Sequence, residues 1–161
     1  MRHLKLAAAF AAAAVLFAGA PASASPGDII DIIVGEGDLL DRLIALDAEG
    51  IADMRDTIAD ARVEIDRAAD DIRFAREEAA EGRGNRLVVL ALSVAAEEIE
   101  QIVGEAVAAA YVEIDDAERR LVGLDVSPEE RNETQSAIDG LRIDLADVEA
   151  ALGRLMEALK D

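Results

Sequence analysis

Apolar residues recur at alternating spacings of three and four over four successive heptads, and this pattern limits the possible folds more than any other feature of the sequence. From Ile51 to Glu78 the chain divides into IADMRDT, IADARVE, IDRAADD and IRFAREE. The first heptad position holds Ile51, Ile58, Ile65, Ile72 and then Ala79, and the fourth holds Met54, Ala61, Ala68 and Ala75. Such a stripe lies along one side of a helix and is typical of coiled coils. Residues 51–82 are therefore predicted to form a long helix that packs closely against other helices.

Charged residues border this stripe unevenly. One edge is mainly basic, and its residues are Arg55, Arg62, Ala69 and Arg76; the other is mainly acidic, and its residues are Thr57, Glu64, Asp71 and Glu78. In an antiparallel homodimer through this stripe, the basic edge of one copy would face the basic edge of the other, and the acidic edges would also face each other. Repulsion between like charges disfavours this arrangement. We therefore expect the stripe to be buried within its own chain, and any dimer to form through the apolar N-terminal segments.

Two further long helices are predicted at 86–121 and 128–160, after turns at Gly82–Asn85 and at 123–127. The apolar stripe of the first comprises Val89, Leu92, Ala96, Ile99, Val103, Val107, Ala110, Ile114, Ala117 and Leu121. That of the second comprises Ile138, Leu141, Leu145, Val148, Leu152, Leu155 and Leu159. Ser127, Pro128 and Glu130 form a capping-box pattern with proline at the first helical position, which predicts where the last helix begins.

The predicted fold class is all-α: an elongated antiparallel three-helix bundle with coiled-coil-like heptad seams over residues 51–161, preceded by one or two short helices. Three helices of similar length, each roughly 50 Å long, joined by short turns favour antiparallel neighbours. Residues 25–50 are expected to form short amphipathic helices broken at Gly35, Gly37 and Gly50. These would either fold back as a cap over the apolar start of the second long helix or extend the first long helix by about three turns. Residues 87–96 carry only Ser93 as a polar residue, so this stretch needs cover from other helices, the N-terminal segment or a partner.

The N-terminus has the pattern of a cleavable secretory signal peptide over residues 1–24. Arg2 and Lys5 precede an apolar stretch from Leu6 to Ala18, and Ala22-Ser23-Ala24 supplies the small residues of a cleavage site. The apolar stretch is shorter than the roughly 20 residues that a spanning helix needs. We therefore expect a periplasmic or secreted protein with no transmembrane span after signal cleavage.

The charge of the chain argues against nucleic acid as a partner. Its formal net charge is −19, and removal of Arg2 and Lys5 would take it to −21. A surface this acidic repels phosphate backbones and attracts cations or basic proteins. We expect a protein partner or self-association, and no nucleic acid.

The missing residue types argue against an enzyme on chemical grounds. The single His is His3, within the expected signal peptide, and the chain has no Cys and no Trp. Histidine general bases, Cys nucleophiles, Ser-His-Asp triads and ordinary zinc sites are thereby excluded from residues 25–161. We expect no catalytic residues, no cofactor and no metal-binding residues.

The leading hypothesis is an exported, non-enzymatic helical protein that acts as a protein-interaction or structural module. Two alternatives stay open: a binder of cations or small ligands that uses the acidic face, and a holdase-type envelope chaperone. The first alternative depends on three acidic clusters: Glu77, Glu78 and Glu81; Glu97, Glu98 and Glu100; and Glu113, Asp115, Asp116 and Glu118. Several of these residues are also expected to pair with Arg at i, i+4, namely Arg73 with Glu77, Asp115 with Arg119 and Asp116 with Arg120, besides Asp38 with Arg42.

Overall fold

The computed structural model describes residues 39–46, 48–84 and 86–160, and the regular secondary structure of these ranges is entirely helical. A short helix, α3 (Leu39–Ala45), precedes three long ones: α4 (Ala48–Ala80), α5 (Arg86–Gly123) and α6 (Pro128–Lys160). The prediction of an all-helical chain is confirmed for these residues. The expected signal peptide at 1–24, and the segment that follows it up to residue 38, lie outside the described residues.

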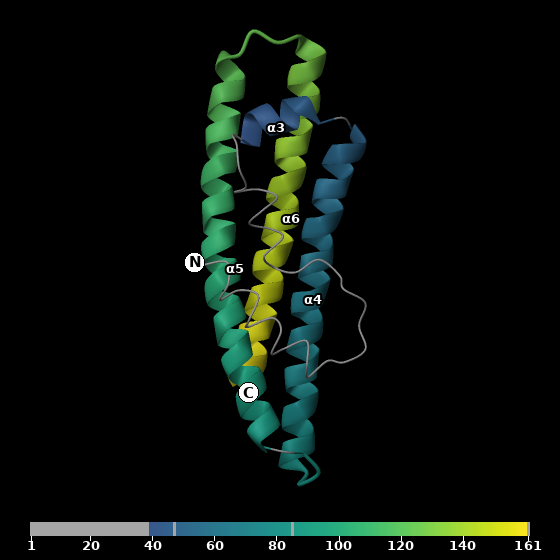
Figure 1. Ribbon diagram of the computed structural model, residues 1–161, viewed down its shortest axis with the longest axis vertical. Helices are drawn as coiled ribbons and strands as arrows, with labels where there is room; N and C mark the ends of the chain where they lie inside the picture. The colour runs from purple at the N-terminus through teal and green to yellow at the C-terminus, as the bar shows by residue number, and fades with distance from the viewer. Residues whose placement is uncertain (1–38, 47, 85, 161) are drawn as a thin grey trace.

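The three long helices lie side by side, and α3 crosses them near the end at which α5 joins α6 (Figure 1). Consecutive long helices run in opposite directions, so α4 and α6 run in the same direction (Figure 1). Ion pairs agree with this arrangement, because Arg55 contacts Asp144 and Asp66, further along α4, contacts Arg154, further along α6.

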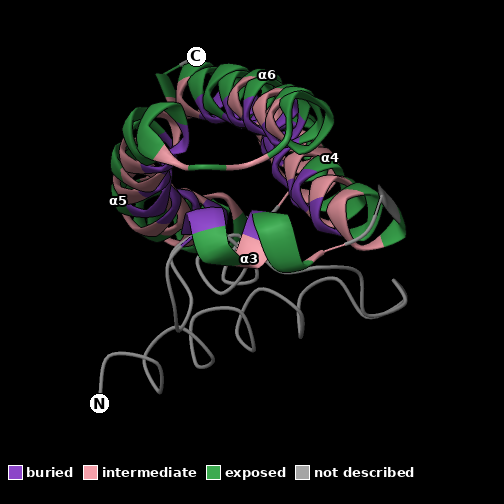
Figure 2. Ribbon diagram, turned by 90° about the horizontal axis from the view of Figure 1, so that it is seen from above, coloured by how far each residue is buried: buried purple, intermediate pink, exposed green. Residues whose placement is uncertain are grey.

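The buried residues lie along the sides of these helices that are turned toward the interior of the bundle (Figure 2), and they form one apolar cluster. Ile58, Ile65 and Ile72 of α4 are at most 2% exposed, as are Ile138 and Leu145 of α6. The buried face of each long helix is wider than one apolar stripe with spacings of three and four, because each long helix contacts two others. Small residues beside the stripes fill this extra width, and they are Ala69, Ala106, Ala137, Ala151 and Ala158. At the third heptad of α4 the buried alanine is consequently Ala69, whereas Ala68 is only partly buried.

Helix α3 contributes to the same core. Leu39, Leu40 and Leu43 are at most 2% exposed and belong to one cluster with the apolar residues of the long helices. Asp41 lies 3.9 Å from Arg120, which places α3 beside the last turns of α5 and not over its apolar start, so α3 does not form the cap that was one of the two expectations.

The ends of the long helices follow from local sequence, with one exception. Gly82 has φ of 76°, a left-handed conformation that glycine adopts at little cost, and it ends α4 near the predicted turn. At the start of α6 the predicted capping box is confirmed: Glu130 N–H donates to Ser127 Oγ at 3.2 Å, and Ser127 N–H donates to Glu130 Oε2 at 3.0 Å. The predicted break at Gly50 is wrong, because α4 begins at Ala48 and includes Gly50. A glycine costs a helix only about 1 kcal/mol, and burial of Met54 one turn later offsets that cost.

Candidate interaction surface

Two of the three acidic clusters are held by arginines. Glu78 and Glu81 both contact Arg83 in the turn after α4, with Glu78 at 2.7 Å. Asp115 and Glu118 of α5 lie 2.8 Å and 2.6 Å from the same nitrogen of Arg142 on α6. These arginines neutralise the carboxylates that a cation would need as ligands. Within the described ranges, no group of three or more His, Cys, Asp or Glu residues is arranged to hold a metal ion.

The local ion pairs differ partly from those expected. Asp116 and Arg120 approach to 4.0 Å at the predicted i, i+4 spacing. Arg73, however, pairs with Asp70 at 2.7 Å rather than with Glu77, and Arg119 pairs with Asp116 at 3.1 Å rather than with the carboxylate of Asp115. Residues three apart and residues four apart both lie on the same face of a helix, so sequence spacing alone does not decide which of the two forms the ion pair. The expected pair of Asp38 with Arg42 lies outside the described residues.

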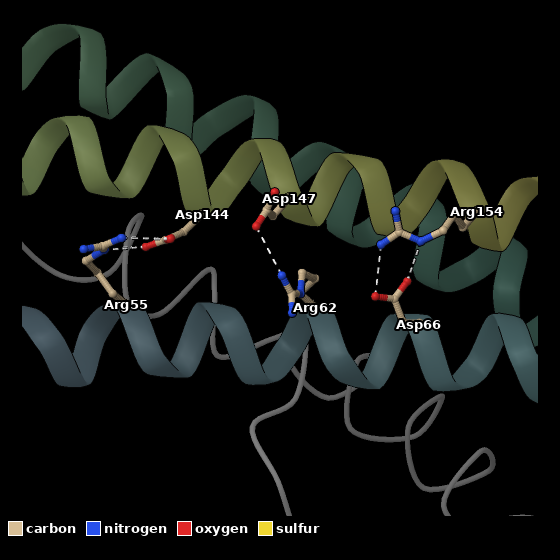
Figure 3. Close-up of polar contacts among 6 residues, drawn as sticks. All are labelled: Arg55, Arg62, Asp66, Asp144, Asp147 and Arg154. Carbon is tan, nitrogen blue, oxygen red and sulfur yellow. Dashed lines mark hydrogen bonds and ion pairs between the residues drawn. The ribbon is translucent and has the colours of Figure 1, made fainter.

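A row of three ion pairs joins the middle of α4 to the middle of α6 (Figure 3). Arg55 donates two hydrogen bonds to Asp144, at 2.6 Å and 3.1 Å, and Arg154 donates two to Asp66, at 2.7 Å and 3.0 Å. Between them, Arg62 donates to Asp147 at 3.2 Å. The paired hydrogen bonds of an Arg with a carboxylate fix orientation as well as distance. This row therefore fixes how α4 and α6 lie against each other.

The order of charges along this row selects a single register. Helix α4 presents two arginines and then Asp66, whereas α6 presents two aspartates and then Arg154. A shift of α6 by about one helical turn that brought Arg154 level with Arg62, instead of with Asp66, would place two guanidinium groups together. The row thus disfavours a slipped packing that the apolar stripes alone would tolerate.

Gly140 allows the first of these pairs to form. A Cβ added at Gly140 would lie 2.8 Å from Arg55 Cζ, so the guanidinium group occupies the space that a side chain would need. Asp144 lies one turn further along α6 and accepts both hydrogen bonds. The hydrogen bonds with Asp144 also raise the pKa of Arg55, despite its partial burial.

We expect the double-mutant cycle of Arg55→Ala with Asp144→Ala to give a coupling free energy of about 1 kcal/mol, at the upper end for a partly exposed pair. Gly140→Ala should reduce this coupling, because its methyl group displaces Arg55. The matched control is Arg73 with Asp70, an exposed pair within one helix that should couple by about 0.3 kcal/mol. Urea unfolding of each variant measures both values, and equal couplings for the two pairs would contradict this role for the row.

Tyr111 reports on the contact between α5 and α6. Its hydroxyl donates to Glu149 Oε2 at 3.2 Å, and the side chain is partly buried against the core. Burial raises the pKa of Tyr111, and the charge of Glu149 and its hydrogen bond raise it further. Tyr111 is the only tyrosine in a chain without tryptophan, so its absorbance and fluorescence can be measured without interference.

Titration of the Tyr111 phenol, followed by phenolate absorbance, should give a pKa above the ordinary value for tyrosine. Glu149→Gln should lower this pKa but leave it above the ordinary value, because burial is the largest cause of the shift. Glu157→Gln, at an exposed position further along α6, is the control and should leave the pKa unchanged. An unchanged pKa in Glu149→Gln would show that the two side chains do not meet in solution.

The first turns of α5 carry an apolar stripe on their outer face. Leu87, Leu90 and Val94 are 72%, 62% and 57% exposed, and their spacing of three and four places them on one side of the helix. Leu92 and Ala96, on the opposite side, are buried against the other helices. The described helices therefore cover only the inner face of a segment that the sequence predicted to need cover on all sides.

This outer stripe, which comprises Leu87, Leu90 and Val94, is bounded by charge. Arg86 precedes it and is exposed, while Glu97 and Glu98 follow it and are also exposed. Val88, next to the stripe in sequence, is 37% exposed. The exposed large apolar residues elsewhere in the described ranges occur singly along their helices, and they are Ile44, Phe74, Val112, Val122 and Ile143. Single apolar residues are normal on protein surfaces, so the grouping of three large apolar residues on one face distinguishes the outer stripe from them.

Sequence reasoning located the segment but not the stripe. The signal was present, since removal of the core positions Val89, Leu92 and Ala96 from the apolar stretch leaves Leu87, Leu90 and Val94 at helical spacing. No helix in the described part of the chain is both long and apolar enough to cross a membrane. Comparisons with models of protein families, with curated proteins and with solved structures found no match.

Proposed function

We propose that this chain is an exported, non-enzymatic helical protein that acts as a protein-interaction or structural module in the cell envelope or outside the cell. Export follows from the signal-peptide pattern of residues 1–24, with cleavage after Ala24. A non-catalytic role follows from the lack of His and Cys in residues 25–161. With its strongly negative charge, the module would bind proteins rather than nucleic acid.

The proposal includes an elongated three-helix bundle with heptad seams over residues 51–161. Burial of Ile58, Ile65 and Ile72 on α4, and of Leu141 and Leu145 on α6, supports packing along those seams. The row of ion pairs between α4 and α6 supports a fixed register. A rigid rod of this kind holds a short surface stripe in a defined position, which suits a module that works by contact.

The observation that carries the proposal is the outer stripe of α5. Leu87 and Leu90 are more than half exposed, although α5 buries a complete face toward the other helices. Exposure of large apolar side chains to water is unfavourable by roughly 25 cal/mol per Å². A partner that covers the stripe would recover that free energy.

The two alternatives receive less support. A cation binder would use the acidic clusters, yet Arg83 and Arg142 occupy four of those carboxylates. A holdase-type chaperone needs a broad apolar surface for unfolded chains, whereas the outer stripe has three large side chains and ends in charge on both sides. A narrow, bounded stripe favours a specific contact.

Site-specific photo-crosslinking in cells that export the protein tests the proposal. A photoreactive residue at Leu90 should give a discrete crosslinked product. The same residue at Ile143 of α6 is the control, because Ile143 and Leu90 are both 62% exposed. No discrete product from Leu90, or the same products from both positions, would refute contact through the outer stripe.

A further inference from the structure

We infer that the outer stripe binds a second copy of this chain, with α5 packed against α5 in antiparallel orientation. This inference rests on the proposed function and names the partner of the same surface. It follows from three observations: the distance of the stripe from α3, the charges at its two ends, and its length.

Helix α3, the described part of the chain before α4, lies far from the stripe. Asp41 lies 3.9 Å from Arg120, so the described chain begins beside the far end of α5. Val94 precedes Arg120 by 26 positions, or about 39 Å along the helix. None of the described helices of the same chain therefore covers the outer stripe.

The stripe is complementary to itself in charge. Arg86 lies at its beginning, and the first turn of α5 has no acidic residue. Ser93, Glu97 and Glu100 follow Arg86 at spacings of seven, four and three, so these four residues lie along one edge of the stripe. When two copies pack in antiparallel orientation, this edge of the first copy lies against the same edge of the second. The basic end of each edge then faces the acidic end of the other.

Two of the three apolar residues of the stripe, Leu90 and Val94, match in the same alignment. With Leu90 of one copy opposite Val94 of the other, two-fold symmetry repeats the contact with the roles exchanged. Arg86 then comes level with the turn of the second copy that carries Glu97 and Glu100. A parallel alignment would instead bring this edge of each copy against the opposite edge of its partner, so that Arg86 of one copy would not meet Glu97 and Glu100 of the other.

The length of the stripe sets the strength of the dimer. Stable dimers bury about 800 Å² on each partner, and two turns of one helix provide less. The net charge of −19 also opposes association, most strongly at low ionic strength. We therefore expect a weak, reversible dimer, with a dissociation constant on the order of 100 µM at about 0.15 M salt.

Sedimentation equilibrium tests this inference on protein expressed from the full sequence, with its N-terminus established by mass spectrometry. The average mass should rise from one chain toward two between about 10 µM and 1 mM. Leu90→Gln should weaken association at least tenfold, whereas Ile143→Gln, at an equally exposed site, should leave it unchanged. Circular dichroism confirms that each variant is folded.

A charge exchange tests the antiparallel alignment. Arg86→Glu alone and the pair Glu97→Arg with Glu100→Arg alone should each abolish the dimer, because like charges then meet at both ends. An equal mixture of these two proteins should dimerise again, since each end then joins opposite charges.

Two results would overturn the inference: a wild-type protein that stays monomeric at 1 mM, or a dimer insensitive to Leu90→Gln and to the charge changes. The second result would place the contact at the N-terminal segment, as the sequence predicts. A crosslink from Leu90 to a different protein would overturn the second copy as occupant and leave the proposed function standing. The absence of any discrete crosslink would refute both.

Discussion

Leu145→Asp is expected to lower the free energy of unfolding by about 4 kcal/mol or more, enough to unfold a marginally stable domain. Leu145 is 0% exposed and belongs to the core cluster formed with residues of α3, α4 and α5. The substitution removes a large apolar side chain and leaves a carboxylate without a partner in the interior. Thermal and urea unfolding followed by circular dichroism measures the loss.

Ile143→Asp is the matched control, because it makes the same kind of change two residues earlier on α6. Ile143 is 62% exposed, so the new carboxylate stays in water and the cost should be within about 1 kcal/mol. Similar losses of stability in the two variants would contradict the assignment of the buried face of α6.

The second large effect is expected at the turn between α4 and α5. Gly84→Ala should cost about 2 to 3 kcal/mol, because a Cβ there would lie 2.5 Å from the backbone nitrogen of Ala79. Backbone atoms cannot move aside as a flexible side chain can. The turn would have to open and weaken the hydrogen bonds that Arg83 N–H and Gly84 N–H donate to the carbonyl of Glu78, at 2.9 Å and 2.7 Å.

Gly104→Ala should have the opposite effect and raise the free energy of unfolding. Gly104 lies within α5, and an added Cβ would meet no atom within 4 Å. Alanine in a helix is favoured over glycine by up to about 1 kcal/mol, so this variant should be more stable than the wild type. Urea unfolding of both variants decides the matter; a stabilising Gly84→Ala would show that the turn has a different structure.

The apolar stripes and the cap of α6 could be predicted because each depends on residues close in sequence. Six of the seven predicted stripe positions of α6, from Ile138 to Leu155, are buried, and Leu159 packs against the core while partly exposed. The capping box needs only Ser127 and Glu130, which lie within one turn. Hydrophobic periodicity and short-range hydrogen bonding were therefore sufficient to predict these features.

Features that depend on two neighbouring helices could not be predicted in the same way. Burial of Ala69 rather than Ala68 arises because α4 contacts two other long helices. The row that begins with Arg55 and Asp144 depends on how far α6 is displaced along α4, and nothing within either helix specifies that displacement. The absence of the expected helix break at Gly50 is likewise a tertiary effect, because packing of α4 outweighs the low helix propensity of glycine.

The outer stripe of α5 could be predicted only in part. Apolar character over residues 87–96 was evident in the sequence, but the face that stays in water depends on which neighbours α5 has. With Leu92 and Ala96 buried against the other helices, Leu87, Leu90 and Val94 are left facing outward.

The direction of α6 relative to α4 is the feature on which the ion-pair row, the core and the outer stripe all depend. The chain has no cysteine, so spin labels can be attached at introduced cysteines without background. We choose the exposed positions Ala52 on α4, and Asp139 and Glu157 on α6. Asp139 should lie level with Ala52, whereas Glu157 lies about 27 Å further along α6.

Pulsed electron paramagnetic resonance on the two doubly labelled proteins measures this arrangement directly. The distance from position 52 to position 139 should be clearly shorter than the distance from 52 to 157. If the pair at 52 and 157 gives the shorter distance, α6 runs opposite to α4, and the packing described for this protein is contradicted.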